Sequence, residues 1–194
     1  GYMLFALVIH AGLPAIWSLP VAGIITALIA VPVGLIVFRL AGPYFAIGTW
    51  VVAEVFKLSF FEVSSLGGGS GVSLPLDAVR SIADSRKGRE LTIYLCALAI
   101  ATASTLGVWA LLRSRLGLGL TAIRDSPVAS ASIGIDTFRL RFSVFVAVAG
   151  FTGMIGALIF LQKLRISPVA AFDVMEWSAA VIFMVVIGGI GRIE

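Results

Sequence analysis

Long apolar segments, separated by short polar ones, run through the whole chain. A helix needs about 20 apolar residues to cross the hydrocarbon core of a membrane. Segments of this kind cover residues 19–38, 43–61, 91–112, 142–161 and 177–190, and residues 1–12 look like the end of another. The pattern predicts an all-α, polytopic transmembrane helical bundle with about six spans. We expect residues 1–194 to form a single transmembrane domain.

Composition agrees with this pattern and excludes several classes of protein. Charged residues make up 12% of the chain and hydrophobic residues 60%, whereas soluble domains carry about 25% charged residues. The single cysteine, Cys96, lies in an apolar run, which excludes a disulfide framework and a cysteine-based zinc site. Basic residues flank the apolar segments instead of mixing with polar surface, so we expect no nucleic-acid partner.

The two ends of the sequence carry a further expectation. The chain starts inside an apolar segment without an initiator methionine, and it stops abruptly after another apolar segment. We therefore expect a fragment of a longer protein, with both flanks missing.

The distribution of basic residues predicts which polar segments face the cytoplasm, because cytoplasmic loops carry an excess of Lys and Arg. Segment 113–141 has five arginines against two aspartates, a net charge of +3. Segments 62–90 and 163–176 each contain equal numbers of basic and acidic residues. We therefore expect 113–141 to be a cytoplasmic loop and 62–90 an external loop. Counting spans back from this loop places Arg39 on the cytoplasmic side as well, in agreement with the rule. Lys163 and Arg165 are a mild exception to it, because they fall on the external side.

The predicted external loop contains a glycine-rich run at 66–71, LGGGSG. A phosphate-binding P-loop has the pattern G-x-x-x-x-G-K-[ST] after a strand. No lysine and no helix start follow these glycines, so a flexible loop is the better interpretation. The next stretch, LDAVRSIADS, predicts a short helical piece.

A compact helix is predicted at 127–133, inside the cytoplasmic segment. Asp125 or Ser126 can cap its start, Pro127 suits its first position, and Gly134 suits the position after its end. Nearly all its side chains are small, which favours close approach to a partner protein. The alternative is an interfacial helix resting on lipid headgroups, but such helices usually carry Leu, Phe or Trp on one face.

Charged and small residues within the spans allow two interpretations each. Glu54 and Lys57 are three residues apart and share a helix face. Charges inside a membrane often mark a transport pathway; alternatively, the pair lies in the last turns, where Lys57 extends to the interface. Gly150, Gly153 and Gly156 place small residues near one helix face, and close helix packing is the favoured explanation.

Several stretches of the sequence together carry a family resemblance. The longest is LTAIRDSPVASASIGID at 120–136. The others are RLAGPYFAI at 39–47, Ala53 and Glu54 with Lys57, LGGGSG at 66–71, Ile166 to Pro168, and VVIGGIG at 185–191. In this order they resemble segments of the permeases of branched-chain amino acid ABC transporters, in particular of their M-type subunit, and 120–136 resembles the cytoplasmic loop of that family. One departure concerns the wider importer superfamily, whose coupling loop reads E-A-A-x-x-x-G, because Val128 stands at the position of that glutamate.

The resemblance implies a permease subunit of an ATP-driven importer in the bacterial inner membrane. Its partners would be a homologous permease, two ATP-binding subunits, an external substrate-binding protein and membrane lipid. The chain has no Walker motif, so we expect it not to be an enzyme and to bind no cofactor or metal; the partner subunits would use ATP. The family is associated with leucine, isoleucine and valine, but its members also carry amides and urea.

The resemblance and the local patterns together give two sets of candidate residues. The set expected to couple to the ATPase is Arg124, Asp125, Ser126, Pro127, Ala129, Ala131 and Gly134. The set expected along the translocation path is Gly42, Pro43, Tyr44, Phe45, Glu54, Gly188 and Gly189. Two other functions stay open, a secondary transporter or channel for a small polar solute, and a membrane scaffold that transports nothing.

Overall fold

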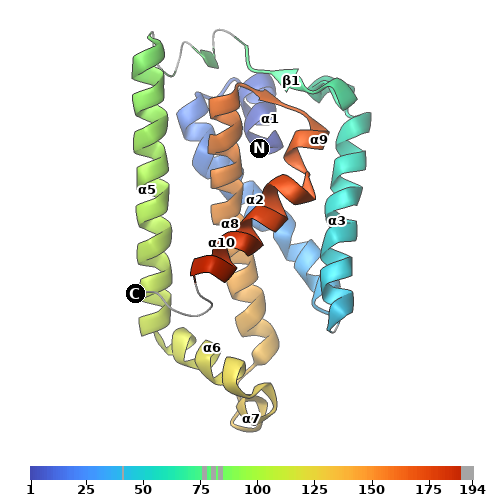
Figure 1. Cartoon of the computed structure of the whole chain (residues 1–194), viewed down its shortest axis with the longest axis vertical. Helices are drawn as coiled ribbons and strands as arrows, with labels where there is room; N and C mark the ends of the chain where they lie inside the picture. Colours follow the sequence, from blue (N-terminus) through green and yellow to red (C-terminus); the bar gives the residue numbers. More distant parts are fainter. Residues whose placement is uncertain (41, 76–77, 80–81, 83–84, 189–194) are drawn as a thin grey trace.

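The structure is a bundle of long helices with a short helical extension at one end (Figure 1). It is a computed structural model that describes residues 1–40, 42–75, 78–79, 82 and 85–188. The long helices are α2 (Ala15–Val37), α3 (Pro43–Glu62), α5 (Arg86–Arg113) and α8 (Thr137–Lys163). Shorter helices are α1 (Tyr2–Ala11), α6 (Arg115–Asp125), α7 (Pro127–Ser132), α9 (Pro168–Ala171) and α10 (Ala180–Gly188).

The predicted fold class is confirmed. Four single helices, α2, α3, α5 and α8, and the combined segment Pro168–Gly188 are each long and apolar enough to cross a membrane, whereas α1 is shorter. Three of the predicted spans start several residues earlier than expected. Helix α2 starts at Ala15, α5 at Arg86 and α8 at Thr137, each about one turn before the predicted start.

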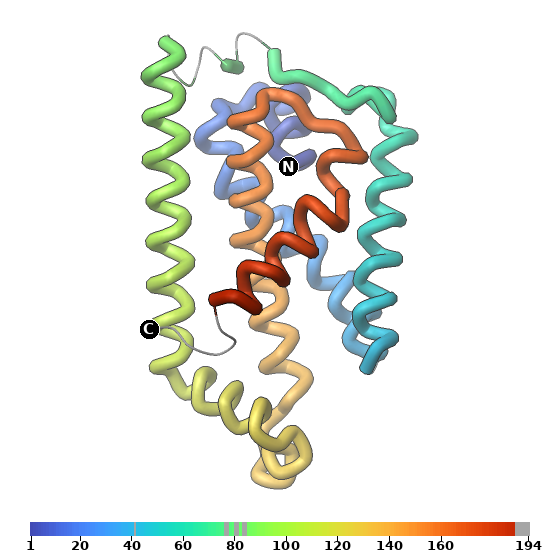
Figure 2. Tube along the Cα trace, viewed as in Figure 1, coloured from blue at the N-terminus to red at the C-terminus, as the bar shows by residue number. Residues whose placement is uncertain are grey.

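The polar connections gather at opposite ends of the bundle. The turn between α2 and α3 lies at the same end as α6 and α7, whereas the connections after α3 and α8 lie at the other end (Figures 1 and 2). This is the grouping that the charge pattern predicts. The assignment of the α7 end to the cytoplasm stays a prediction from charge.

The most extensive helix pairing in the bundle is that of α2 with α8, and glycines let the two helices approach closely. A Cβ atom on Gly153 would lie 2.6 Å from Cβ of Thr26, and a Cβ atom on Gly23 would lie 3.0 Å from the carbonyl oxygen of Gly150. At the other end of the same interface, Gly34 lies against the rings of Phe142 and Phe145. Gly153 is therefore a packing residue, as the sequence indicates, whereas a Cβ atom on Gly156 would make only ordinary contact, 3.5 Å from the nitrogen of Gly1.

The glycine-rich run is not the open loop that we expected. Two 3₁₀ turns, η1 (Ser64–Leu66) and η2 (Gly68–Ser70), lead into strand β1 (Val72–Ser73), which pairs antiparallel with β2 (Arg165–Ile166). Arg165 also donates a hydrogen bond from Nη2 to the carbonyl oxygen of Ser70, at 3.1 Å. Gly71 has φ +76° and lies directly against Ile166, so a side chain there would clash. Pairing with a distant segment therefore orders this loop. The helical piece predicted after it falls mostly outside the described residues.

The last predicted span is interrupted, and it starts earlier than expected. Helix α9 ends at Ala171, a π-helical turn η3 covers Val174–Ala179, and α10 continues to Gly188. Serine and aspartate side chains start both pieces: Ser167 accepts from the N–H of Ala170, and Asp173 from those of Met175 and Glu176. This pattern of caps divides the segment into two helical parts.

Candidate functional site

Helix α7 has the local structure that its sequence predicts. Ser126 caps it by accepting a hydrogen bond from the N–H of Ala129 at 3.3 Å, and Pro127 occupies the first helical position. Gly134 follows with φ +85°. The N–H of Ile135 then bonds to the carbonyl of Ser130 at 3.0 Å, which closes the helix in a Schellman arrangement. Of the two expected caps, Ser126 is the one used.

The outer surface of α7 is apolar and unusually accessible. Val128 is 79% exposed and Ile133, just after the helix, is 74% exposed, while Ala129 and Ala131 are exposed between them. Ser130 is the buried residue of this helix, and its hydroxyl donates to the carbonyl of Ser126 at 2.8 Å. Helix α7 forms the tip of the bundle (Figure 1). The surface is therefore shallow and apolar, with two branched side chains projecting from small neighbours.

Helix α6, which the sequence analysis missed, holds α7 in place. Ser114 caps α6 by accepting a hydrogen bond from the N–H of Gly117 at 3.4 Å. Ile123 is 3% exposed, so one face of α6 is buried. The helix packs against α5, α7 and α8. The helical spacing of Leu116, Leu120 and Ile123 is the signal that could have found α6; the two glycines between them obscured it.

The charged part of the predicted coupling set lies where α6 ends. The Nε atom of Arg124 and the Oδ1 atom of Asp125 are 3.3 Å apart, and both side chains are about two-thirds exposed. An exposed pair of this kind contributes little to stability. These two groups are therefore available to a partner next to the apolar surface of α7.

The residues predicted for the translocation path do not form one site. Gly42 has φ +57° and starts α3 together with Pro43, while Tyr44 is 69% exposed and Phe45 packs edge-on to Phe38, with ring centroids 5.4 Å apart.

The remaining path residues lie apart from that turn. Oε1 of Glu54 lies 3.0 Å from Nζ of Lys57, and both side chains are partly exposed. Gly188 is exposed at the end of α10, and Gly189 lies outside the described residues. The pathway role of this set stays a prediction.

Two cavities adjoin the interruption in the last span. One, of about 370 Å³, lies among α1, α2, α3, α8 and α9, with Phe60, Phe160, Phe172 and Trp177 among its lining residues. The other, of about 500 Å³, lies between α3 and the segment 171–182. Phe172 and Trp177 line both. The part of the chain that the structure describes contains no cluster of three or more His, Cys, Asp or Glu side chains suited to a metal.

The second cavity contains a carboxylate that the sequence analysis did not single out. Asp173 lines it together with Thr49, Trp50 and Ser178. Because the last span was expected to start at 177, Asp173 was counted among the charges of an external loop. The sequence does contain a signal for a broken helix. Ser167 followed by Pro168 marks one helix start, and Asp173, five residues after Pro168, is a second capping residue that marks another.

The comparisons with known proteins converge on one family. Residues 1–193 match the family described as branched-chain amino acid transport system, permease component. The chain is 30% identical to the high-affinity branched-chain amino acid transport system permease protein LivM of Salmonella typhimurium, and equally to LivM of Escherichia coli. Each alignment covers 98% of this chain and 50% of the relative, so the chain spans about half the length of these relatives. No solved structure matches the chain significantly.

Proposed function

The chain belongs to the permease family of branched-chain amino acid transport systems, and on that premise we propose that it is a permease subunit of an ATP-driven importer. The proposed substrates are branched-chain or related amino acids. The observation that carries the coupling part of this proposal is α7, a rigidly capped helix whose apolar outer surface is exposed at the tip of the bundle. An exposed apolar surface with polar neighbours such as Arg124 and Asp125 suits contact with a protein partner.

The packing around α7 explains how a partner would act on the spans. Helix α7 contacts α6 and α8, and α6 contacts α5 and α8. Helix α8 in turn makes the most extensive helix contact of the bundle, with α2. A displacement of α7 is therefore transmitted to α5 and α8, and α8 then moves against α2. Closure of an ATPase dimer on the α7 surface would tilt these spans and switch the path between two openings.

The proposed importer contains four kinds of component. This chain pairs with a homologous permease, two ATP-binding subunits dock on the α7 side in the cytoplasm, and a soluble binding protein delivers the amino acid on the opposite side. The complex lies in the bacterial inner membrane. The coupling contact is formed by Arg124, Asp125, Ser126, Pro127, Ala129, Ala131 and Gly134.

The function is tested by placing a bulky side chain on the α7 surface. Replacing the exposed Ala131 with Trp should abolish ATP-dependent amino acid uptake by cells, because the indole prevents close approach of the ATPase. Membrane insertion should be unchanged. Ala103→Trp is the matched control, since Ala103 is also exposed but lies on the membrane-spanning helix α5; it should retain uptake. Normal uptake by Ala131→Trp would contradict the proposal.

Co-purification separates the importer from a secondary transporter. The full-length protein should co-purify with ATP-binding subunits, and Ala131→Trp should reduce their recovery. A secondary transporter would show no such association, and its uptake would follow an ion gradient instead of ATP.

A further inference from the structure

The cavity between α3 and the broken last span has the composition of a site for a small zwitterion. Its volume, about 500 Å³, lies in the range of small-molecule sites. Aromatic and aliphatic groups line most of it, and its polar side chains are Thr49, Asp173 and Ser178. A mostly apolar site with a few placed polar groups is typical of a specific ligand site.

Asp173 is the charged group in this cavity. It belongs to the segment Pro168–Gly188, which is long and apolar enough to cross a membrane. An ionisable residue in a membrane-spanning segment often marks a substrate pathway. Its Oδ1 atom accepts both capping bonds, from the N–H of Met175 at 2.7 Å and from that of Glu176 at 3.0 Å. These bonds leave Oδ2 without a hydrogen bond among the described residues.

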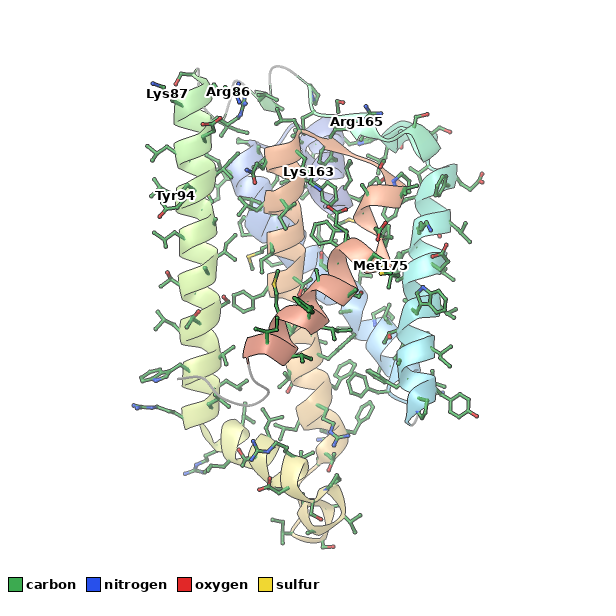
Figure 3. All side chains as sticks on the ribbon, viewed as in Figure 1. Arg86, Lys87, Tyr94, Lys163, Arg165 and Met175 are labelled. Carbon is green, nitrogen blue, oxygen red and sulfur yellow. The ribbon has the colours of Figure 1, made fainter. Side chains whose placement is uncertain are left out.

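The nearby lysine does not neutralise Asp173. Lys163, at the end of α8, points toward η3 (Figure 3), and its Nζ atom lies 3.0 Å from Oε1 of Glu176. The same Nζ lies 5.6 Å and 5.7 Å from the ring centroids of Phe160 and Trp177. Within the described part of the chain, Asp173 takes part in no ion pair. Its carboxylate is therefore free to bind a cation from outside the chain.

The remaining lining fits the other parts of an amino acid. Trp50, Phe172 and Trp177 offer flat apolar surfaces to an aliphatic side chain. The hydroxyl of Ser178 makes no hydrogen bond within the described chain and can donate to a carboxylate, whereas that of Thr49 already donates to the carbonyl of Ala46 at 2.8 Å. Trp50 is 59% exposed, so the cavity is open on one side. In the proposed importer the second permease would close that side.

We propose that this cavity is a binding site for the transported amino acid, with Asp173 as the counter-ion of its α-ammonium group and the aromatic walls around its aliphatic side chain. The inference rests on the proposed function, because it names the residues that receive the substrate. The site differs from the path predicted from the sequence, because none of the described path residues lines this cavity.

The competing explanation is that Asp173 serves only to cap η3. The variant Asp173→Asn separates the two roles, because asparagine is as good a cap as aspartate and accepts the same two N–H bonds. It removes the negative charge and puts an NH2 group in place of Oδ2, the oxygen that accepts no capping bond. A second variant, Trp50→Ala, removes an exposed apolar wall that takes no part in any cap. Glu90→Gln is the matched charge control, since Glu90 is exposed and pairs with Arg86 on α5.

The test measures equilibrium binding of radiolabelled leucine to the full-length protein in its assembled complex, embedded in lipid nanodiscs. External binding protein and ATP are left out, so the result does not depend on coupling through α7. The competitor is 4-methyl-2-oxopentanoate, which has the carbon skeleton and carboxylate of leucine but no ammonium group.

We expect leucine to bind and the oxo acid to compete poorly. Asp173→Asn should weaken leucine binding by roughly tenfold or more, the loss that follows removal of a hydrogen bond to a charged group, and leucine should then bind no better than the oxo acid. Trp50→Ala should reduce the preference for leucine over glycine. Glu90→Gln should bind leucine as the unmodified complex does.

Two results would overturn the site. One is unchanged leucine affinity in Asp173→Asn, which would leave Asp173 as a cap alone. The other is equal competition by leucine and the oxo acid in the unmodified complex, which would exclude recognition of the ammonium group. Neither result contradicts the importer proposal, which the loss of uptake in Ala131→Trp supports independently. Conversely, if leucine binding depends on Asp173 but uptake needs no ATPase, the binding site is supported and the importer proposal is contradicted.

Discussion

At the scale of single residues, the glycines of the α2–α8 interface decide how closely these two helices approach. Thr26, opposite Gly153, is held in one rotamer because its hydroxyl donates to the carbonyl of Ala22 at 2.7 Å. It therefore cannot turn aside for a larger neighbour. A methyl group on Gly153 would meet both Cβ and Oγ1 of Thr26 at 2.6 Å.

We accordingly expect Gly153→Ala to destabilise the protein by about 1–3 kcal/mol, the usual cost of overpacking. A lower melting temperature in detergent would show this loss. Gly107→Ala on α5 is the matched control, because the nearest atom to the new methyl group would be Cζ of Phe151 at 3.9 Å. That variant should be neutral or slightly stabilised, since alanine favours a helix more than glycine does. Equal melting temperatures for the two variants would contradict the packing role of Gly153.

At the scale of elements, α7 depends on its caps because it is only six residues long. A helix this short is marginal without them. The Ser126 cap satisfies one free N–H at its start, and the bonds from Gly134 and Ile135 satisfy carbonyls at its end. The helix is also connected directly to α6 and, through 133–136, to α8, so its orientation follows from theirs.

Removing the cap with Ser126→Ala should cost about 1 kcal/mol of local stability. Hydrogen exchange of the amides in α7 should then be about fivefold faster, and amino acid uptake should fall because the docking surface frays. Ser132→Ala is the control: the Ser132 hydroxyl donates to the carbonyl of Val128 and caps nothing. If both variants exchanged at the rate of the unmodified protein, the cap would not be what holds α7.

At the scale of the whole molecule, the bundle separates two polar ends. The end with α6 and α7 carries the arginine excess, and the end with η1, η2 and the β1–β2 pair has balanced charge. Between them, the outer faces of α3, α5 and α10 are covered with exposed large apolar side chains. Those faces suit lipid or further transmembrane helices.

Cysteine labelling tests which end faces the cytoplasm. Residues 1–194 contain one cysteine, Cys96. Cys96→Ser, with any cysteine elsewhere in the full-length protein also replaced, provides a background for Ser65→Cys in η1 and Ser132→Cys in α7, both exposed positions. A membrane-impermeant maleimide added to intact cells should label Ser65→Cys and leave Ser132→Cys unlabelled. Both should react after permeabilisation. Labelling of Ser132→Cys in intact cells would contradict the cytoplasmic position of α7.

The features that sequence reasoning predicted correctly are those with local causes. The apolar segments located the five segments that are long enough to cross a membrane, and Ser126, Pro127 and Gly134 set the bounds of α7 to within one residue. Helix α6 had a weaker local signal, because Gly117 and Gly119 interrupt it. In each case the cause lies within about one turn of the residue concerned, which is why a single sequence suffices to find it.

The sequence alone therefore determined a polytopic helical protein, the charge difference between its two ends and the capped helix at its tip. Only the tertiary structure decided which distant residues meet. It paired 72–73 with 165–166, and it brought Asp173 to the same cavity as Thr49 and Trp50, more than a hundred residues earlier in the chain. Such contacts depend on the packing of whole helices against one another, and no short stretch of the sequence contains that information.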